Sequence, residues 1–175
     1  AIDFDIGSLT FNYQLSIINY KLLIIMNISI FRRRFTKWGW DGSLFINGIF
    51  FCGTLENCRS RLAQGTYKIA LLPVYNQGKG SCSIMPVILK ETSRIPKSVI
   101  RKPVIMPGNG PYTLKYGSII IGKSQITGLV AHSEQCYMVF RKKIDEALEN
   151  GEEISLVIRN WGVEDIPLKY LSLFQ

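Results

Sequence analysis

The segment from Val104 to Gly122 reads VIMPGNGPYTLKYGSIIIG and contains the residues best suited to form a site. Ser118 begins a β-branched apolar run, and a serine hydroxyl can act as a nucleophile when a base lies beside it. His132 is the single histidine of the chain, so it is the imidazole available to serve as that base. Glycine turns flank the connecting segment, and they predict that Asn109 and Ser118 lie near each other at the edge of a sheet.

The same region offers groups that could bind a ligand without reacting with it. Asn109 lies in the turn Gly108–Gly110, where its amide could contact a ligand or bond to the backbone of its own turn. The glycine N–H groups are a further set of donors. Glu56 ends an apolar hairpin arm and could orient a base or bind a ligand, or it could form a solvated ion pair with Arg59 or Arg61.

The cysteines do not predict a metal site. The spacing of Cys52, Cys58, Cys82 and Cys136 matches no zinc pattern, and His132 is the only histidine that could join them. Cys52 lies in an apolar run and Cys136 on the face of a predicted helix, so both are interpreted as small buried residues. Cys58 and Cys82 lie in polar surroundings and could pair in an oxidising compartment. No cofactor motif is present, and we expect no cofactor.

The composition indicates a globular protein with a basic surface. Hydrophobic residues make up 47% of the 175 residues and charged residues 19%, which excludes an intrinsically disordered chain. The formal net charge of +8 favours anionic partners, such as nucleic acid, anionic lipid or an acidic cell-wall polymer. The basic clusters Arg32–Arg34 and Arg141–Lys143 are short. Arg32–Arg34 fall in a predicted strand, so the Arg33 side chain is expected on the opposite face from those of Arg32 and Arg34. No nucleic-acid-binding motif accompanies the charge.

The first 25 residues are predicted to lie outside the globular domain. Residues 15–31 are largely apolar, but polar residues interrupt them, so they predict strand structure rather than a membrane span. Asp3 and Asp5 precede this run, whereas a secretory signal begins with basic residues. We expect an extension over 1–25, native or not, followed by one domain over 26–175. A cytoplasmic or virion-associated location is favoured over secretion.

Short apolar runs separated by turn residues predict a sheet-rich fold. Asn47 and Gly48 predict a hairpin between residues 44–46 and 49–52. A strand over 66–72 is expected to end at Pro73, followed by a mobile loop over 75–83. Further strands are expected over 27–35, 84–89, 104–106, 118–121 and 154–158.

One long helix is predicted over 133–150. Ser133 is a suitable N-cap, and Gly151 suits the left-handed position after the last turn. Apolar residues recur at helical spacing on one face, at Tyr137, Phe140, Ile144 and Leu148. The predicted fold is therefore α+β, with a mostly antiparallel curved sheet or partial barrel and this helix packed on it.

The order of the motifs resembles an uncharacterised domain family of phages, prophages and Bacteroidetes. The shared motifs, over residues 26–159, are an FFCGTLE arm, a GTYKI strand, an I-x-P-G-N turn, a G-x-I strand start and a GEEISLVI strand. In that family the turn carries a histidine and the later strand opens with Gly-Cys-Ile. This pair is similar to the catalytic signature of the L,D-transpeptidases, which cross-link peptidoglycan through a cysteine activated by histidine. Met106 and Ser118 stand at these two positions here.

The resemblance implies a role at the cell envelope, while the two departures remove the expected chemistry. Methionine accepts no proton at neutral pH, and serine without a base is a poor nucleophile. We therefore expect a cell-envelope-associated binding or accessory module with a degenerate catalytic site. One alternative is a peptidoglycan-directed acyl transferase or hydrolase that uses Ser118 and His132. A basic nucleic-acid-binding protein and a structural virion protein are further alternatives.

Overall fold

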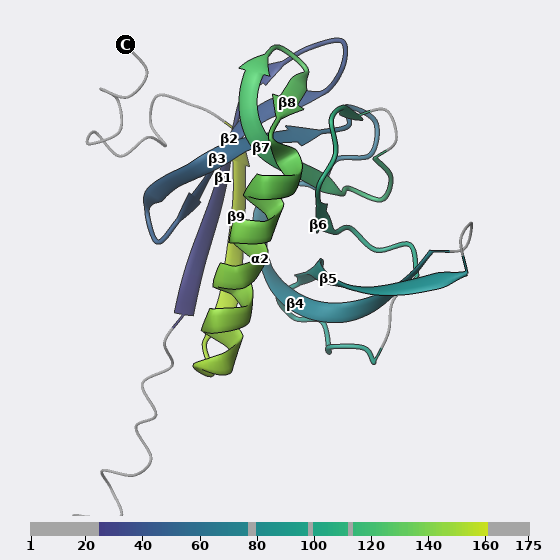
Figure 1. Ribbon diagram of the computed structural model, residues 1–175, viewed down its shortest axis with the longest axis vertical. Coiled ribbons are helices and arrows are strands. Elements are labelled where there is room, and N and C mark those ends of the chain that lie inside the picture. Colours follow the sequence, from purple (N-terminus) through teal and green to yellow (C-terminus); the bar gives the residue numbers. More distant parts are fainter. Residues whose placement is uncertain (1–24, 77–79, 98–99, 112–113, 161–175) are drawn as a thin grey trace, which may run out of the picture.

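The computed structural model describes residues 25–76, 80–97, 100–111 and 114–160, and this part of the chain forms nine strands and one helix (Figure 1). The elements are β1 (Ile25–Phe35), β2 (Trp40–Ile46), β3 (Ile49–Glu56), β4 (Gly65–Asn76), β5 (Ser81–Lys90), β6 (Ile105–Met106), β7 (Ile119–Ile126), β8 (Leu129–Ala131), α2 (Ser133–Glu149) and β9 (Glu153–Asn160). The predicted extension over 1–25 lies outside the described residues, except for Ile25, which begins β1.

The strands form one curved sheet in the order β5-β4-β9-β1-β2-β3-β7-β6, with β8 paired to β7. The pairs β1–β9 and β6–β7 are parallel, and the other pairs are antiparallel. The two ends of this order approach each other, because Val87 and Val104 form a bridge and the Ile88 N–H donates to the Pro103 carbonyl at 2.9 Å. The sheet is therefore a nearly closed barrel, which confirms the predicted fold class.

The main core forms between the curved sheet and α2. Alternate residues of β1 are buried, as the period of a half-buried strand requires. Phe140, Ile144 and Ala147 of α2 belong to the same buried cluster as Ile28 and Ile30 of β1. Figure 1 shows the helix running alongside β9. The helix predicted over 133–150 is confirmed, and it is followed by Gly151 at φ 75°.

The hairpin between β2 and β3 forms at the predicted turn. Asn47 and Gly48 have φ values of 49° and 77°, and Ile46 pairs with Ile49 across the turn. Both turn positions thus have the positive φ that a two-residue hairpin of this kind needs. The Asn47 carboxamide oxygen also accepts a hydrogen bond from the Asn27 N–H at 2.8 Å, which fixes the turn against β1.

The prediction that Pro73 ends a strand is wrong. β4 continues to Asn76, and Pro73 pairs with Ile84 of β5. β9 pairs with β4 only over residues 65–68, so the outer part of β4 has β5 on one side alone. Proline lacks an N–H and is tolerated on such an unpaired edge. The loop predicted over 75–83 is correspondingly shorter, since β5 begins at Ser81.

Candidate functional site

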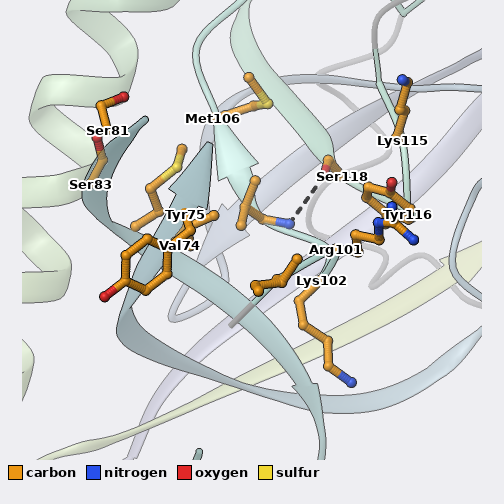
Figure 2. Close-up of a pocket in the computed structure, with 13 residues that line it drawn as sticks. Val74, Tyr75, Ser81, Ser83, Arg101, Lys102, Met106, Lys115, Tyr116 and Ser118 are labelled. Atoms are coloured by element: carbon orange, nitrogen blue, oxygen red, sulfur yellow. Dashed lines mark hydrogen bonds between the residues drawn. The ribbon is translucent and has the colours of Figure 1, made fainter. Parts of the chain in front are cut away.

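Ser118 lies in a tight turn that leads into β7. Its N–H donates to the Lys115 carbonyl at 3.0 Å, and the two residues between them, Tyr116 and Gly117, have φ values of 59° and 82°. The Ser118 side chain is buried, and its hydroxyl accepts a hydrogen bond from the Val104 N–H at 3.2 Å (Figure 2). The hydroxyl therefore joins the segment before β6 to the start of β7.

The turn at Ser118 borders a cavity of about 420 Å³. Met106 lines the same cavity, and it lies on β6, which runs parallel to β7 with Ile105 opposite Ile119. The β4–β5 hairpin forms the facing wall. Figure 2 shows Tyr75, Ser81 and Ser83 of the hairpin on one side and Ser118, Tyr116 and Lys115 on the other. The structure thus places Met106 and Ser118 on one cavity, whereas Asn109, predicted to lie near Ser118, does not line it.

The cavity wall is basic. Arg101, Lys102 and Lys115 line it, and none of the described residues on its wall is a carboxylate. None of the three forms a salt bridge among the described residues. Arg101 and Tyr116 also have left-handed backbone, with φ values of 58° and 59°, which is uncommon for residues other than glycine and is enriched at binding sites.

Asn57 holds the segment that leads to Ser118. Its side-chain amide donates to the Pro111 carbonyl at 3.0 Å and to the Leu114 carbonyl at 3.3 Å. The Ser60 hydroxyl donates to the Leu114 carbonyl at 3.3 Å. The loop after β3 therefore positions one wall of the cavity. Sequence reasoning did not single out Asn57, because its partners lie more than fifty residues away.

His132 does not lie in the Ser118 cavity. It is the exposed N-cap residue of α2, with φ 51°, and its Nδ1 is in hydrogen-bond contact with the Gln135 side-chain amide at 3.2 Å. It lines a different cavity, at the start of the helix. The pairing of His132 with Ser118, considered from the sequence, is therefore not formed in this structure.

The turn Gly108–Gly110 faces the start of α2 and β8 rather than the Ser118 cavity. The Gly108 N–H donates to the Ser133 hydroxyl at 2.9 Å, and the exposed Asn109 accepts from the Val130 N–H through its carbonyl at 3.4 Å. A side chain at Gly108 would come within 2.8 Å of Ile120, so this glycine permits close packing. Its N–H is engaged within the protein rather than presented to a ligand.

Ser133 does not cap the helix, contrary to the prediction. His132 is the N-cap residue, and no side-chain capping bond is formed. The buried Ser133 hydroxyl instead donates to the Ile121 carbonyl at 2.5 Å and accepts from the Gly108 N–H. Ser133 thus ties the helix start to β7 and to the Gly108 turn.

Glu56 forms a buried ion pair, so the predicted solvated pair with Arg59 or Arg61 is wrong. Its carboxylate binds Arg32 through two hydrogen bonds, at 2.9 and 2.7 Å. Both side chains are 1% exposed. Glu56 therefore neither orients a base nor reaches a ligand.

The cysteines form an arrangement that sequence reasoning missed. Cys52 of β3 and Cys136 of α2 line one cavity at the start of the helix. Both were interpreted as small buried residues, and Cys52 is buried. Cys136 is only partly buried. Cys58 and Cys82 are free thiols, so the pairing considered for them is not formed. No group of three or more metal-ligating side chains occurs in the described ranges.

Comparisons with protein-family models, with curated proteins and with solved structures find no match to this chain. Among the described residues, no helix has the length and apolar character needed to cross a membrane. The function is therefore inferred from the site and from the motifs of the sequence.

Proposed function

We propose that this chain is a non-catalytic binding module of the cell envelope, and that the cavity beside Ser118 holds an anionic group of a cell-wall polymer. The observation that carries the proposal is a set of three cationic side chains, Arg101, Lys102 and Lys115, on one cavity wall. The residues known to line that wall include no carboxylate. The resemblance implies a catalytic cysteine and histidine at positions 118 and 106, where this chain has Ser118 and Met106.

The electrostatics of the cavity favour an anion. Like charges in a recess with low-dielectric walls raise the local potential and concentrate counter-ions. A carboxylate or phosphate entering there relieves the mutual repulsion of the cations, and a guanidinium can bind either group through two parallel hydrogen bonds. Tyr75 and Tyr116 are about half exposed and offer aromatic surface for the sugar or peptide part of the ligand.

The same cavity lacks the parts of an acyl-transfer site. The Met106 thioether cannot take a proton, and the Ser118 hydroxyl already accepts from the Val104 N–H. His132 lines another cavity, and Glu56 is held by Arg32. Nucleophilic catalysis needs a nucleophile and a base in contact, so these placements support binding over catalysis.

The proposal is tested by sedimentation with purified, insoluble peptidoglycan sacculi that retain their anionic polymers. The variant Arg101→Gln/Lys102→Gln removes two positive charges from the cavity. The matched control Lys142→Gln/Lys143→Gln removes two from α2, where Lys142 is exposed and lies 3.8 Å from Glu146. We expect the cavity variant to bind at least about tenfold more weakly, and the control to retain its binding. Equal losses in both variants would contradict the proposal.

Two further measurements separate the alternatives. Ser118→Ala should bind sacculi as the wild type does, and the wild type should release no muropeptides. Release that Ser118→Ala abolishes would establish the acyl-transfer alternative instead. Retention on DNA or RNA that exceeds retention on sacculi, and that falls steeply with salt, would favour the nucleic-acid alternative.

A further inference from the structure

A second cavity, of about 360 Å³, lies at the start of α2 and contains two thiols. Cys52 comes from β3, Lys123 from β7, and His132 and Cys136 from the N-cap and the first turn of the helix. Phe51 and Val139 supply apolar wall. This cavity shares no lining residue with the one beside Ser118, so it is a separate site.

The two thiols differ in exposure and in acidity. Cys52 is 4% exposed, and its pKa is raised by its hydrogen bond with Cys136 and by burial. Cys136 is partly exposed, and its pKa is lowered by the hydrogen bond from Cys52 and by the charge of Lys123, against the effect of burial. The Cys136 N–H donates to the His132 carbonyl in the first turn, where the helix dipole also favours a negative charge.

We propose that Cys136 and Cys52 form a thiol–disulfide exchange site for a low-molecular-weight disulfide, with Cys136 as the attacking thiol and Cys52 as the resolving thiol. Both cysteines line the cavity, and they come from two different elements: Cys136 is partly exposed and Cys52 is buried. Exchange requires this arrangement, because the attacking sulfur must be reachable from solvent and the resolving sulfur must reach the intermediate.

The reaction proceeds in two balanced steps. The Cys136 thiolate attacks one sulfur of the small disulfide, forms a mixed disulfide and releases one small thiolate, which takes a proton from water. Cys52 then loses its proton to water, and its thiolate attacks the Cys136 sulfur. The bond from Cys136 to the second small thiol breaks, and that thiol leaves as a thiolate and is protonated. Two protein thiols are oxidised to one disulfide, and one small disulfide is reduced to two thiols.

The first step activates the second. While Cys136 is a thiolate, its negative charge and the hydrogen bond from Cys52 oppose ionisation of Cys52. Formation of the mixed disulfide removes that charge and that strong acceptor. The Cys52 thiol then ionises more readily, at the moment when its thiolate is needed.

The test uses the full chain with Cys58→Ser and Cys82→Ser, which leaves Cys52 and Cys136 as the only thiols. The protein is treated with oxidised glutathione, quenched in acid and analysed by intact mass and peptide mapping. We expect a Cys52–Cys136 disulfide and no lasting adduct. In this background, a protein that also carries Cys52→Ala should accumulate glutathione on Cys136. A protein that instead carries Cys136→Ala should keep Cys52 reduced. A lasting adduct on Cys136 with Cys52 present, or no reaction at Cys136, would falsify the proposal.

A second measurement does not depend on replacing the buried Cys52. The rate of Cys136 alkylation by iodoacetamide is followed against pH in the same background. The titratable and charged groups that line this cavity with Cys136 are Cys52 of β3, Lys123 of β7 and His132 of the N-cap. Lys123→Gln should move the midpoint of the rate-against-pH curve to higher pH, because it removes a positive charge near the Cys136 thiolate. Lys143→Gln should leave that midpoint unchanged. If the midpoint of Cys136 alkylation is the same in Lys123→Gln as in its parent, Lys123 does not stabilise the Cys136 thiolate. That result overturns the role proposed for Cys136.

Discussion

Arg32 and Glu56 form a two-point ion pair inside the core, with Nε–Oε1 and Nη2–Oε2 distances of 2.9 and 2.7 Å. The same Arg32 Nη2 donates to the Leu62 carbonyl at 2.7 Å. Arg32 lies on β1 and Glu56 ends β3, so the pair links two strands and the segment that leads to β4. Burial of a charge is costly unless its partner and its hydrogen bonds are in place, and here both conditions are met.

Removal of one member of this pair should destabilise the protein strongly. Arg32→Met leaves the Glu56 carboxylate buried without its cation, and we expect a loss of about 3–5 kcal/mol in the free energy of unfolding. Arg32→Met/Glu56→Leu should recover much of the loss, because no buried charge remains. Urea unfolding followed by circular dichroism measures both. Lys142→Met is the control, because Lys142 and Glu146 are 79% and 56% exposed in their pair, and its loss should cost less than about 1 kcal/mol.

Ser133→Ala should destabilise the start of α2. The change leaves the buried Ile121 carbonyl and the part-buried Gly108 N–H without their present partner. A buried group left in this way costs about 1–3 kcal/mol, and a part-buried one costs less. Thermal and urea unfolding report the total loss. Ser93→Ala serves as the control, because Ser93 is partly exposed in the turn after β5 and its N–H bond to the Lys90 carbonyl is kept. This change should alter stability by less than about 0.5 kcal/mol. Equal effects of the two changes would show that the Ser133 hydrogen bonds contribute little.

Gly117→Ala should cost more than Gly80→Ala, although both glycines have positive φ. Gly80 has φ 59° with open space where the new methyl group would lie, so only the backbone cost of about 1–2 kcal/mol applies. At Gly117, with φ 82°, a methyl group would come within 2.9 Å of Leu62 and 3.1 Å of the Ser60 carbonyl. The clash should add about 1–3 kcal/mol, measured by urea unfolding.

Stability should fall at alkaline pH in part through Tyr137. Burial raises the pKa of the Tyr137 phenol above its ordinary value of 10.0, against the opposing effect of a hydrogen bond with Arg141. As pH rises, the Tyr137 phenol therefore loses its proton in the unfolded chain before it does so in the folded one. Its contribution to the free energy of unfolding is complete below pH 10 and is lost as pH rises through the folded-state pKa. Tyr137→Phe should flatten the decline of unfolding free energy above pH 10, and an unchanged slope would refute this assignment.

The burial of Arg32 had a signal in the sequence, but its pairing with Glu56 did not. Arg32 shares the alternation of Ile28 and Ile30, so its position on the buried face of β1 is implied by the period of the strand. A charged side chain is almost never fully buried unless it is paired, so the period alone does not predict its burial. The partner that makes burial tolerable, Glu56, lies on a strand two places away in the sheet, and strand order is not encoded in the period.

The sequence by itself determined most of the strands, the Asn47–Gly48 hairpin, the helix and the curved α+β architecture, because these depend on local backbone preferences and on the spacing of apolar residues. The tertiary structure decided which side chains meet. Closure of the barrel places Ser118 beside Arg101 and away from His132, and packing of α2 on the sheet brings Cys136 to Cys52. Such contacts join residues far apart in the chain, and their geometry depends on strand order and helix placement, which no local pattern specifies.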